Sequence, residues 1–231
     1  ITTIAIGLIA ACLLLFSASL IKFPKKLKQK DKADSNDGVI FTIAAKSPIF
    51  KKLCIIQFLY FPALMTIPTH IAVHGTDIGM SQTQAALLLS TIGAASIIGR
   101  LSVGIFLDKM GGRRSYLFCF IPILLSLIIF IVTTNHIILF FFVGLYGFAH
   151  GALFVVVPPT IAEYFGLRDH ASLFGIVIFC GTIGGAIGPI LAGAAFDLTG
   201  SYNIAFATLF VLIALSSIVA LTLPAIKKFN I

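Results

Sequence analysis

The stretch Gly99–Arg114, GRLSVGIFLDKMGGRR, decides how the rest of the chain is interpreted. Its second half is crowded with charge, whereas its first half is apolar except for Arg100, which lies eight residues before Asp108. The run that precedes Arg100, AALLLSTIGAASIIG, contains no charged residue. A permanent cation therefore lies inside an apolar segment that ends in a charged loop.

The chain as a whole is strongly apolar. Of its 231 residues, 59% are hydrophobic and 10% are charged, and the mean hydropathy is +1.10. Soluble domains carry about 25% charged residues, so this composition excludes a water-soluble fold and indicates a protein surrounded by lipid. The net charge of +8 does not indicate a nucleic-acid partner, because basic residues of membrane proteins sort to one side of the bilayer.

Seven apolar stretches are long enough to cross a bilayer as helices of about 20 residues. Their continuous apolar character excludes the alternating pattern of a β-barrel, so we expect an all-α membrane protein. The expected spans are 1–21, 52–73, 82–106, 115–134, 137–159, 171–195 and 203–224. Residues 22–51 form a polar connector, whose lysines can rest on anionic lipid headgroups.

The basic residues sort to one side if these seven spans alternate in direction. The segment 22–52 holds nine lysines, and the other basic residues outside the spans are Lys109, Arg113, Arg114, Arg168, Lys227 and Lys228. The opposite connections, near 74–81, 135–136 and 196–202, contain neither Lys nor Arg. The positive-inside rule therefore places the linker 22–51 and the C-terminus in the cytoplasm, and we expect a multi-pass protein of the plasma membrane.

The six spans after the linker contain a short internal repeat. Residues 104–111, GIFLDKMG, and residues 193–200, GAAFDLTG, both follow the pattern GxxxDxxG at an offset of 89 residues. This offset corresponds to three spans, and three is an odd number, so the second copy is expected upside down relative to the first. Inverted repeats of three plus three helices are typical of transporters.

The stretch GIFLDKMGGRR resembles the signature loop of the major facilitator superfamily, G-x-x-x-[DE]-[RK]-x-G-x-[RK]-[RK], at every defined position. The resemblance implies that the seven spans correspond to the sixth to twelfth helices of a twelve-helix carrier. Residues 1–21 are then the last helix of the N-terminal half, 22–51 the linker, and 52–231 the six-helix C-terminal half. We therefore expect the chain to be the C-terminal part of a longer protein, with the missing N-terminal half as its partner.

The same resemblance implies a gate at the inner end of the bundle. The residues that match the motif are Gly104, Asp108, Lys109, Gly111, Arg113 and Arg114. Asp108 would hold the inner gate shut in the outward-open state, while Gly104 allows close helix approach and Gly111 a tight turn. The alternative is a basic loop that sets the topology without any role in gating.

Two further features are expected at the inner end of the fifth span. Glu163 and Arg168 lie five residues apart, and we expect them to form a salt bridge near this gate or to be separate surface charges. Pro158 and Pro159 are expected to break the helix just before them.

A narrower resemblance rests on residues 68–100, PTHIAVHGTDIGMSQTQAALLLSTIGAASIIGR. They are similar to the branch of monocarboxylate porters and oxalate/formate antiporters, which shares a Pro-x-His, an Asp-x-Gly and a Gly-Arg. The corresponding residues are Pro68, His70, Asp77, Gly79, Gly99 and Arg100. In that branch, the arginine of the eighth helix binds the substrate carboxylate, which implies the same role for Arg100.

Two positions depart from the better-known members of this branch. Ser96 stands where animal monocarboxylate carriers have an aspartate, and the span 171–195 lacks the lysine of oxalate exchangers. One cation suits a monoanion better than a dianion.

Helical spacing places Ser96 and Arg100 on one face, and a guanidinium matches a carboxylate as a planar fork. The alternative is an arginine that reaches the headgroups or pairs with a structural acid.

Three other side chains are candidates for the transport pathway. His150 can relay a coupling proton, or it can be a neutral histidine that hydrogen bonds between helices. His70 either lines the cavity or lies at the interface. Tyr60 can donate a hydrogen bond to a substrate, or it serves only in packing.

No feature of the sequence indicates an enzyme. It contains no phosphate-binding loop, no Ser/His/Asp set and no cluster with metal-ligand spacing, so neither a cofactor nor a metal is expected. We therefore predict a secondary active carrier of a small organic anion, such as lactate, formate or pyruvate, that works by alternating access with proton symport. The alternatives are an oxalate/formate exchanger and a membrane sensor that does not transport.

Overall fold

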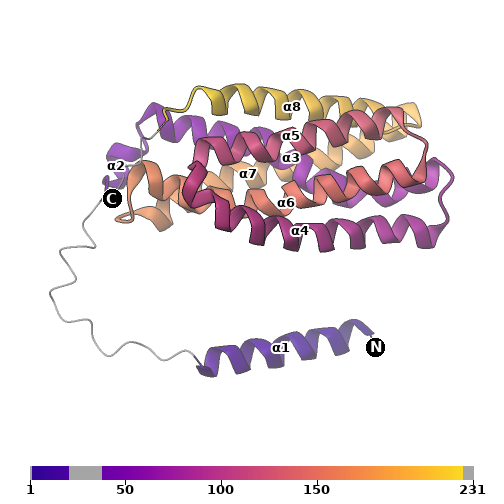
Figure 1. Cartoon of the computed structure of the whole chain (residues 1–231), viewed down its shortest axis with the longest axis horizontal. Helices are drawn as coiled ribbons and strands as arrows, with labels where there is room; N and C mark the ends of the chain where they lie inside the picture. The colour runs from indigo at the N-terminus through magenta and orange to yellow at the C-terminus, as the bar shows by residue number, and fades with distance from the viewer. Residues whose placement is uncertain (1, 21–37, 226–231) are drawn as a thin grey trace. The chain divides into compact units, whose positions relative to one another are not determined.

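The computed structural model describes residues 2–20 and 38–225 of the chain. These belong to two separate units, Ile1–Asp37 and Gly38–Ile231. In the first unit, helix α1 spans Thr2–Leu20, where the first membrane span is expected (Figure 1). Residues 22–37 of the expected linker lie outside the described residues, as do Ile21, Lys227 and Lys228.

The second unit is a bundle of helices (Figure 1). A short helix, α2 (Phe41–Ala44), is followed by six helices long and apolar enough to cross a membrane. They are α3 (Pro48–Asp77), α4 (Gln82–Met110), α5 (Gly112–Val132), α6 (His136–Phe165), α7 (His170–Thr199) and α8 (Asn203–Leu221). The prediction of an all-α membrane protein with spans at these positions is confirmed, although α3, α4, α6 and α7 extend several residues beyond the expected ends.

Local sequence explains where these helices begin and end. Ser47 caps α3 by accepting the N–H of Phe50 at 3.1 Å, and Ser81 forms a capping box with Gln84 at the start of α4. Glycines with positive φ end three of the helices, because this conformation is unfavourable for other residues. They are Gly111 (76°) after α4, Gly166 (75°) after α6 and Gly200 (68°) after α7.

The expected break at Pro158 and Pro159 is wrong, since α6 continues through both prolines to Phe165. A proline removes one backbone donor, but a helix in lipid tolerates this when neighbouring groups bind the freed carbonyl. Helix α3 shows how this works at Pro68, which leaves the carbonyl of Leu64 without its helical partner. The hydroxyl of Tyr146 lies 3.4 Å from that carbonyl oxygen and 3.0 Å from the carbonyl oxygen of Ala63.

The contacts between helices follow a twofold pattern in which α3 corresponds to α6, α4 to α7 and α5 to α8. The most extensive contacts join α4 to α6 and α3 to α7, and this correspondence converts one pair into the other. It likewise converts the pair α5–α6 into α8–α3, while α5–α8 maps onto itself. Because Gly111 and Gly200 close equivalent helices, the structure confirms the three-plus-three inverted repeat that the GxxxDxxG pattern predicts.

Glycines allow the backbones of α4 and α6 to touch. A side chain on Gly99 would overlap the backbone of Phe148, and one on Gly151 would overlap the backbone of Ser96. Gly104 makes no such close approach within this bundle, because a Cβ there would lie at an ordinary 3.8 Å from Val155. The crossing point of the two helices is nearer to Gly99, so a glycine is required there instead.

The equivalent contact between α7 and α3 is also built from glycines. A side chain on Gly184 would overlap the backbone of Phe58, and a Cβ on Gly188 would lie 3.0 Å from Pro62. The expected close contact through Gly181-x-x-x-Gly185 and Gly184-x-x-x-Gly188 is therefore confirmed.

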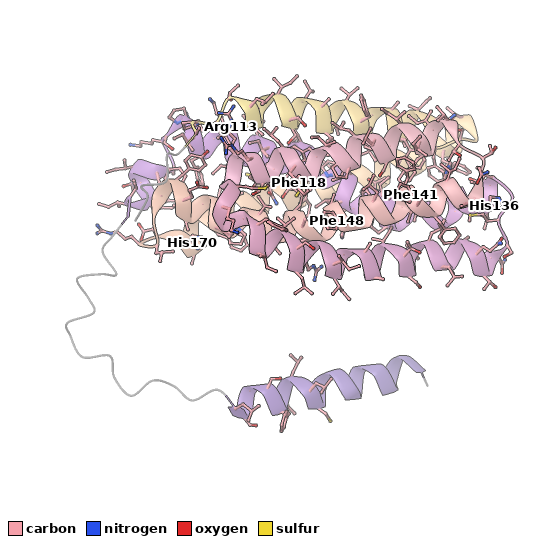
Figure 2. The ribbon with its side chains drawn as sticks, viewed as in Figure 1. Arg113, Phe118, His136, Phe141, Phe148 and His170 are labelled. Carbon is pink, nitrogen blue, oxygen red and sulfur yellow. The ribbon has the colours of Figure 1, made fainter. Side chains whose placement is uncertain are left out.

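Charge separates the two ends of the bundle. The connections α4–α5 and α6–α7 lie at one end, together with the start of α3, and the other three lie at the opposite end (Figure 1). Apart from Arg100, the Lys and Arg residues that the structure describes belong to the first end, which we call the basic end: Lys46, Lys51, Lys52, Lys109, Arg113, Arg114 and Arg168. Figure 2 places Arg113 and His170 at the basic end and His136 at the opposite end.

A matched pair of substitutions on α4 tests the glycine contact. Gly99→Ala is expected to lower the free energy of unfolding by about 1–3 kcal/mol, since the new methyl group overlaps the backbone of α6. Gly93→Ala is the control, because a Cβ at Gly93 meets no atom within 4 Å. It should be neutral or stabilising by up to about 1 kcal/mol through helix propensity. Thermal unfolding of the purified chain in detergent measures both, and equal effects would contradict the contact.

Candidate functional site

Arg100 lies over an aromatic ring of the neighbouring helix. Its guanidinium carbon is 5.7 Å from the ring centroid of Phe154 on α6, a distance typical of a cation–π contact. The imidazole of His150, one turn earlier on α6, meets the same ring edge to face at 5.4 Å. Phe61 of α3 packs against it at 6.1 Å. We call Arg100, His150 and Phe154 the Arg100 cluster.

A buried tyrosine orients His150 within this cluster. The hydroxyl of Tyr146 donates to the carbonyl of Ala63 at 3.0 Å and lies 3.2 Å from Nδ1 of His150. Because the hydroxyl has one proton, and that proton is committed to Ala63, Nδ1 of His150 donates to the tyrosine oxygen. This leaves Nε2 with the lone pair that can take up a proton.

Two predicted site residues have hydroxyls that are committed elsewhere. Ser96 is buried, and its hydroxyl donates to the carbonyl of Gly93 at 2.8 Å within α4. Tyr60 is 1% exposed, and its hydroxyl donates to Oε1 of Gln57 at 2.6 Å. The helical face shared by Ser96 and Arg100 is thus divided, since Ser96 turns towards α6 while Arg100 is exposed.

His70 belongs to a separate group at the opposite end of the bundle. Its Nδ1 lies 3.1 Å from the hydroxyl of Tyr202, and its Nε2 lies 3.1 Å from the carbonyl oxygen of Pro189. The imidazole therefore joins α3 to α7 and to the residue that precedes α8.

At the basic end, residues of the signature loop surround a hollow of about 670 Å³. Its walls include Lys109, Gly111, Arg113, Arg114, Glu163 and Tyr164. Gly111 is the single residue between α4 and α5, and its φ of 76° confirms the predicted tight turn. The side chain of Asp108 lies outside the described residues, so its role as a latch stays a prediction.

The expected salt bridge between Glu163 and Arg168 is wrong. Both residues are described, and no ion pair joins them; Oε2 of Glu163 instead accepts the N–H of Gly112 at 2.7 Å. The carboxylate therefore caps α5, where the helix dipole favours a negative charge. Gly166 ends α6 between the two residues and leaves Arg168 exposed beyond the helix.

The end of the expected linker also contacts the α6–α7 connection, which the sequence does not indicate. The N–H of Val39 donates to the carbonyl of Phe165 at 2.8 Å, and the N–H of Phe41 donates to Oδ2 of Asp169 at 2.7 Å. These partners lie more than a hundred residues apart, and no local pattern marks them.

Comparison with known proteins agrees with this architecture. Residues 53–229 match the sequence family described as "Major Facilitator Superfamily". The chain belongs to the major facilitator superfamily. Its fold is similar to that of the superfamily transporter FucP in the outward conformation, with a TM-score of 0.69 at 17% identity, covering 96% of this chain and 53% of FucP.

Two similar curated proteins are monocarboxylate transporters by name. Human monocarboxylate transporter 7 is 33% identical over 151 residues, which cover 64% of this chain and 28% of that protein. Rat monocarboxylate transporter 13 is 30% identical over 182 residues, or 74% of this chain and 42% of the relative. The chain thus spans less than half the length of either relative.

The helix cap at the basic end gives a second prediction. Glu163→Ala removes the acceptor of the Gly112 N–H and is expected to destabilise the bundle by about 1 kcal/mol, while Glu163→Gln retains an acceptor and costs less. Arg168→Ala is the control and is expected to stay within about 0.5 kcal/mol of the parent. Thermal unfolding measures all three variants. A loss of stability in Arg168→Ala equal to that in Glu163→Ala would support a salt bridge between the two residues instead.

Proposed function

We propose that this chain supplies the C-terminal half of a secondary carrier for a small monocarboxylate, such as lactate, formate or pyruvate, that works by alternating access with proton symport. In this proposal α1 is the last helix of the N-terminal half, and α3 to α8 form the C-terminal half. The basic end faces the cytoplasm of a plasma-membrane protein. The observation that carries the proposal is the position of Arg100.

Arg100 is the one described Lys or Arg of the bundle that lies away from the basic end. It is eight residues from the end of the motif helix at Asp108, a rise of about 12 Å at about 1.5 Å per residue. An arginine near the bilayer centre costs about 2.5–3.5 kcal/mol and normally faces a bundle interior or a wet cavity. A role in binding an anion explains why the chain carries this cost.

The exposed side of the bundle supports the same proposal. Helices α4 and α7, which the repeat relates to each other, are the least buried along their apolar windows. They present large apolar side chains outward, among them Ile98 and Leu101 beside Arg100. The second half of a carrier would cover such a face and enclose Arg100 in a central cavity.

The Arg100 cluster also explains how an anion and a proton can bind together. The charge of Arg100 opposes a second positive charge on His150, because both groups lie against Phe154. A carboxylate bound to the guanidinium neutralises that charge, so Nε2 of His150 takes up a proton more readily. Binding of either ligand then favours binding of the other, so that the anion and the proton occupy the carrier together. The names of the two relatives, both monocarboxylate transporters, support the substrate class.

The first test of this proposal is uptake of labelled lactate into proteoliposomes that contain the full-length carrier. Arg100→Leu is expected to reduce uptake by about 10–100-fold, the effect of about 1.5–3 kcal/mol for a charged hydrogen-bond partner. Lys46→Leu, which removes an exposed cation at the basic end, should leave uptake unchanged. Full uptake by Arg100→Leu would contradict the proposed site.

A second test separates symport from exchange. His150→Gln is expected to abolish lactate accumulation driven by a proton gradient while retaining lactate counterflow at equal pH, because the amide cannot carry a proton. Oxalate counterflow in the parent protein, without any response to the proton gradient, would favour the exchanger instead.

A further inference from the structure

The opposite end of the bundle holds a second group of ionisable side chains, centred on His70. Tyr202 is 4% exposed, stacks on Phe196 at 4.5 Å and stands at the N-cap position of α8. His74 lies one turn after His70, is 6% exposed, and packs edge to face on Phe206 at 5.0 Å. The imidazole of His70 is the polar link that joins α3 to α7 and to the start of α8.

The partners of His70 define which of its nitrogens carries the proton. The carbonyl of Pro189 can only accept, so Nε2–H donates to it. Nδ1 then has the lone pair and accepts the hydroxyl proton of Tyr202. Nδ1 can therefore take up a proton when the hydroxyl of Tyr202 rotates, because the tyrosine oxygen can then accept the new N–H.

Two carboxylates at this end of the bundle contribute a negative potential at that hydroxyl. Burial, together with the negative charges of Asp77 and Asp197, raises the pKa of the Tyr202 hydroxyl above its ordinary value. The other ionisable groups at this end are His74 and His136, and the latter lies 3.3 Å from the carbonyl oxygen of Ile78. The described Lys and Arg residues lie elsewhere, so the field around His70 is set by acids.

We propose that His70, with Tyr202 as its switchable partner, is a second proton-binding site of this carrier, at the end that receives protons from outside. On protonation, Nδ1 gains a hydrogen and donates to the oxygen of Tyr202. The hydroxyl proton of Tyr202 then turns away from Nδ1. No covalent bond other than the new N–H forms, and both contacts of the imidazole are retained.

Protonation strengthens this link between α3, α7 and α8. Hydrogen bonds from a charged donor are stronger than neutral ones, and the described acidic side chains at this end of the bundle, Asp77 and Asp197, favour an added positive charge. We therefore infer that external acid tightens the α7–α8 connection and favours closure of this end of the bundle. The inference rests on the proposed transport function and on the orientation proposed with it.

The decisive variant is His70→Gln, because an amide reproduces both hydrogen bonds of the neutral imidazole but cannot titrate. Lactate uptake is measured between about pH 8 and about pH 6 outside, the range in which imidazole changes charge. The parent protein should respond to pH through both His150 and His70, and His70→Gln should retain uptake with a shallower pH response, because only the contribution of His150 remains. His136→Gln is the matched control at the same end and should keep the response. An unchanged profile in His70→Gln would overturn the proposal.

Hydrogen exchange of the full chain in detergent tests the site without relying on transport. After correction for the intrinsic effect of pH, amides around residues 197–206 should gain protection on acidification in the parent and lose that gain in His70→Gln and Tyr202→Phe. No gain in the parent would overturn the proton site. If the carrier takes up no carboxylate at any pH, the proposed function fails, and this exchange measurement still decides the proton site.

Discussion

The arrangement of the bundle depends on the backbone contact between α4 and α6. Two glycines, Gly99 and Gly151, remove the side chains that would otherwise separate these helices. Arg100 follows the first of them directly, and Phe154 lies one turn after the second. The cation is consequently held over the aromatic ring by the same contact that packs the helices, so a change in this crossing changes the site.

The inverted repeat places a matching contact between α3 and α7, but the two halves differ in chemistry. At the offset of 89 residues, the position of Arg100 is taken by Pro189 in the second copy. Its carbonyl oxygen contacts His70 of α3. One copy therefore presents a permanent cation, and the other holds a titratable imidazole. A symmetric scaffold thus carries two unlike polar groups, each beside a close helix crossing.

The spans can be predicted from the length of the apolar stretches. The GxxxDxxG repeat can be found in the sequence because each copy ends a helix at a glycine with positive φ. The site is less predictable, since its contacts join residues that are distant in sequence. Glu163 and Gly112 are 51 residues apart, and His70 and Tyr202 are 132 apart. Helical spacing places Ser96 and Arg100 on one face, but it cannot tell that only Arg100 remains exposed after α6 packs against α4.

The proposed role of Arg100 is to bind the carboxylate of the transported anion. The most direct measurement is the rate at which phenylglyoxal, a reagent for guanidinium groups, modifies Arg100 in the full-length carrier, with each arginine resolved by mass spectrometry. Lactate is expected to slow the modification of Arg100 and to leave that of Arg113 and Arg168 unchanged. Equal modification of Arg100 with and without lactate, in a preparation that transports lactate, would contradict this role.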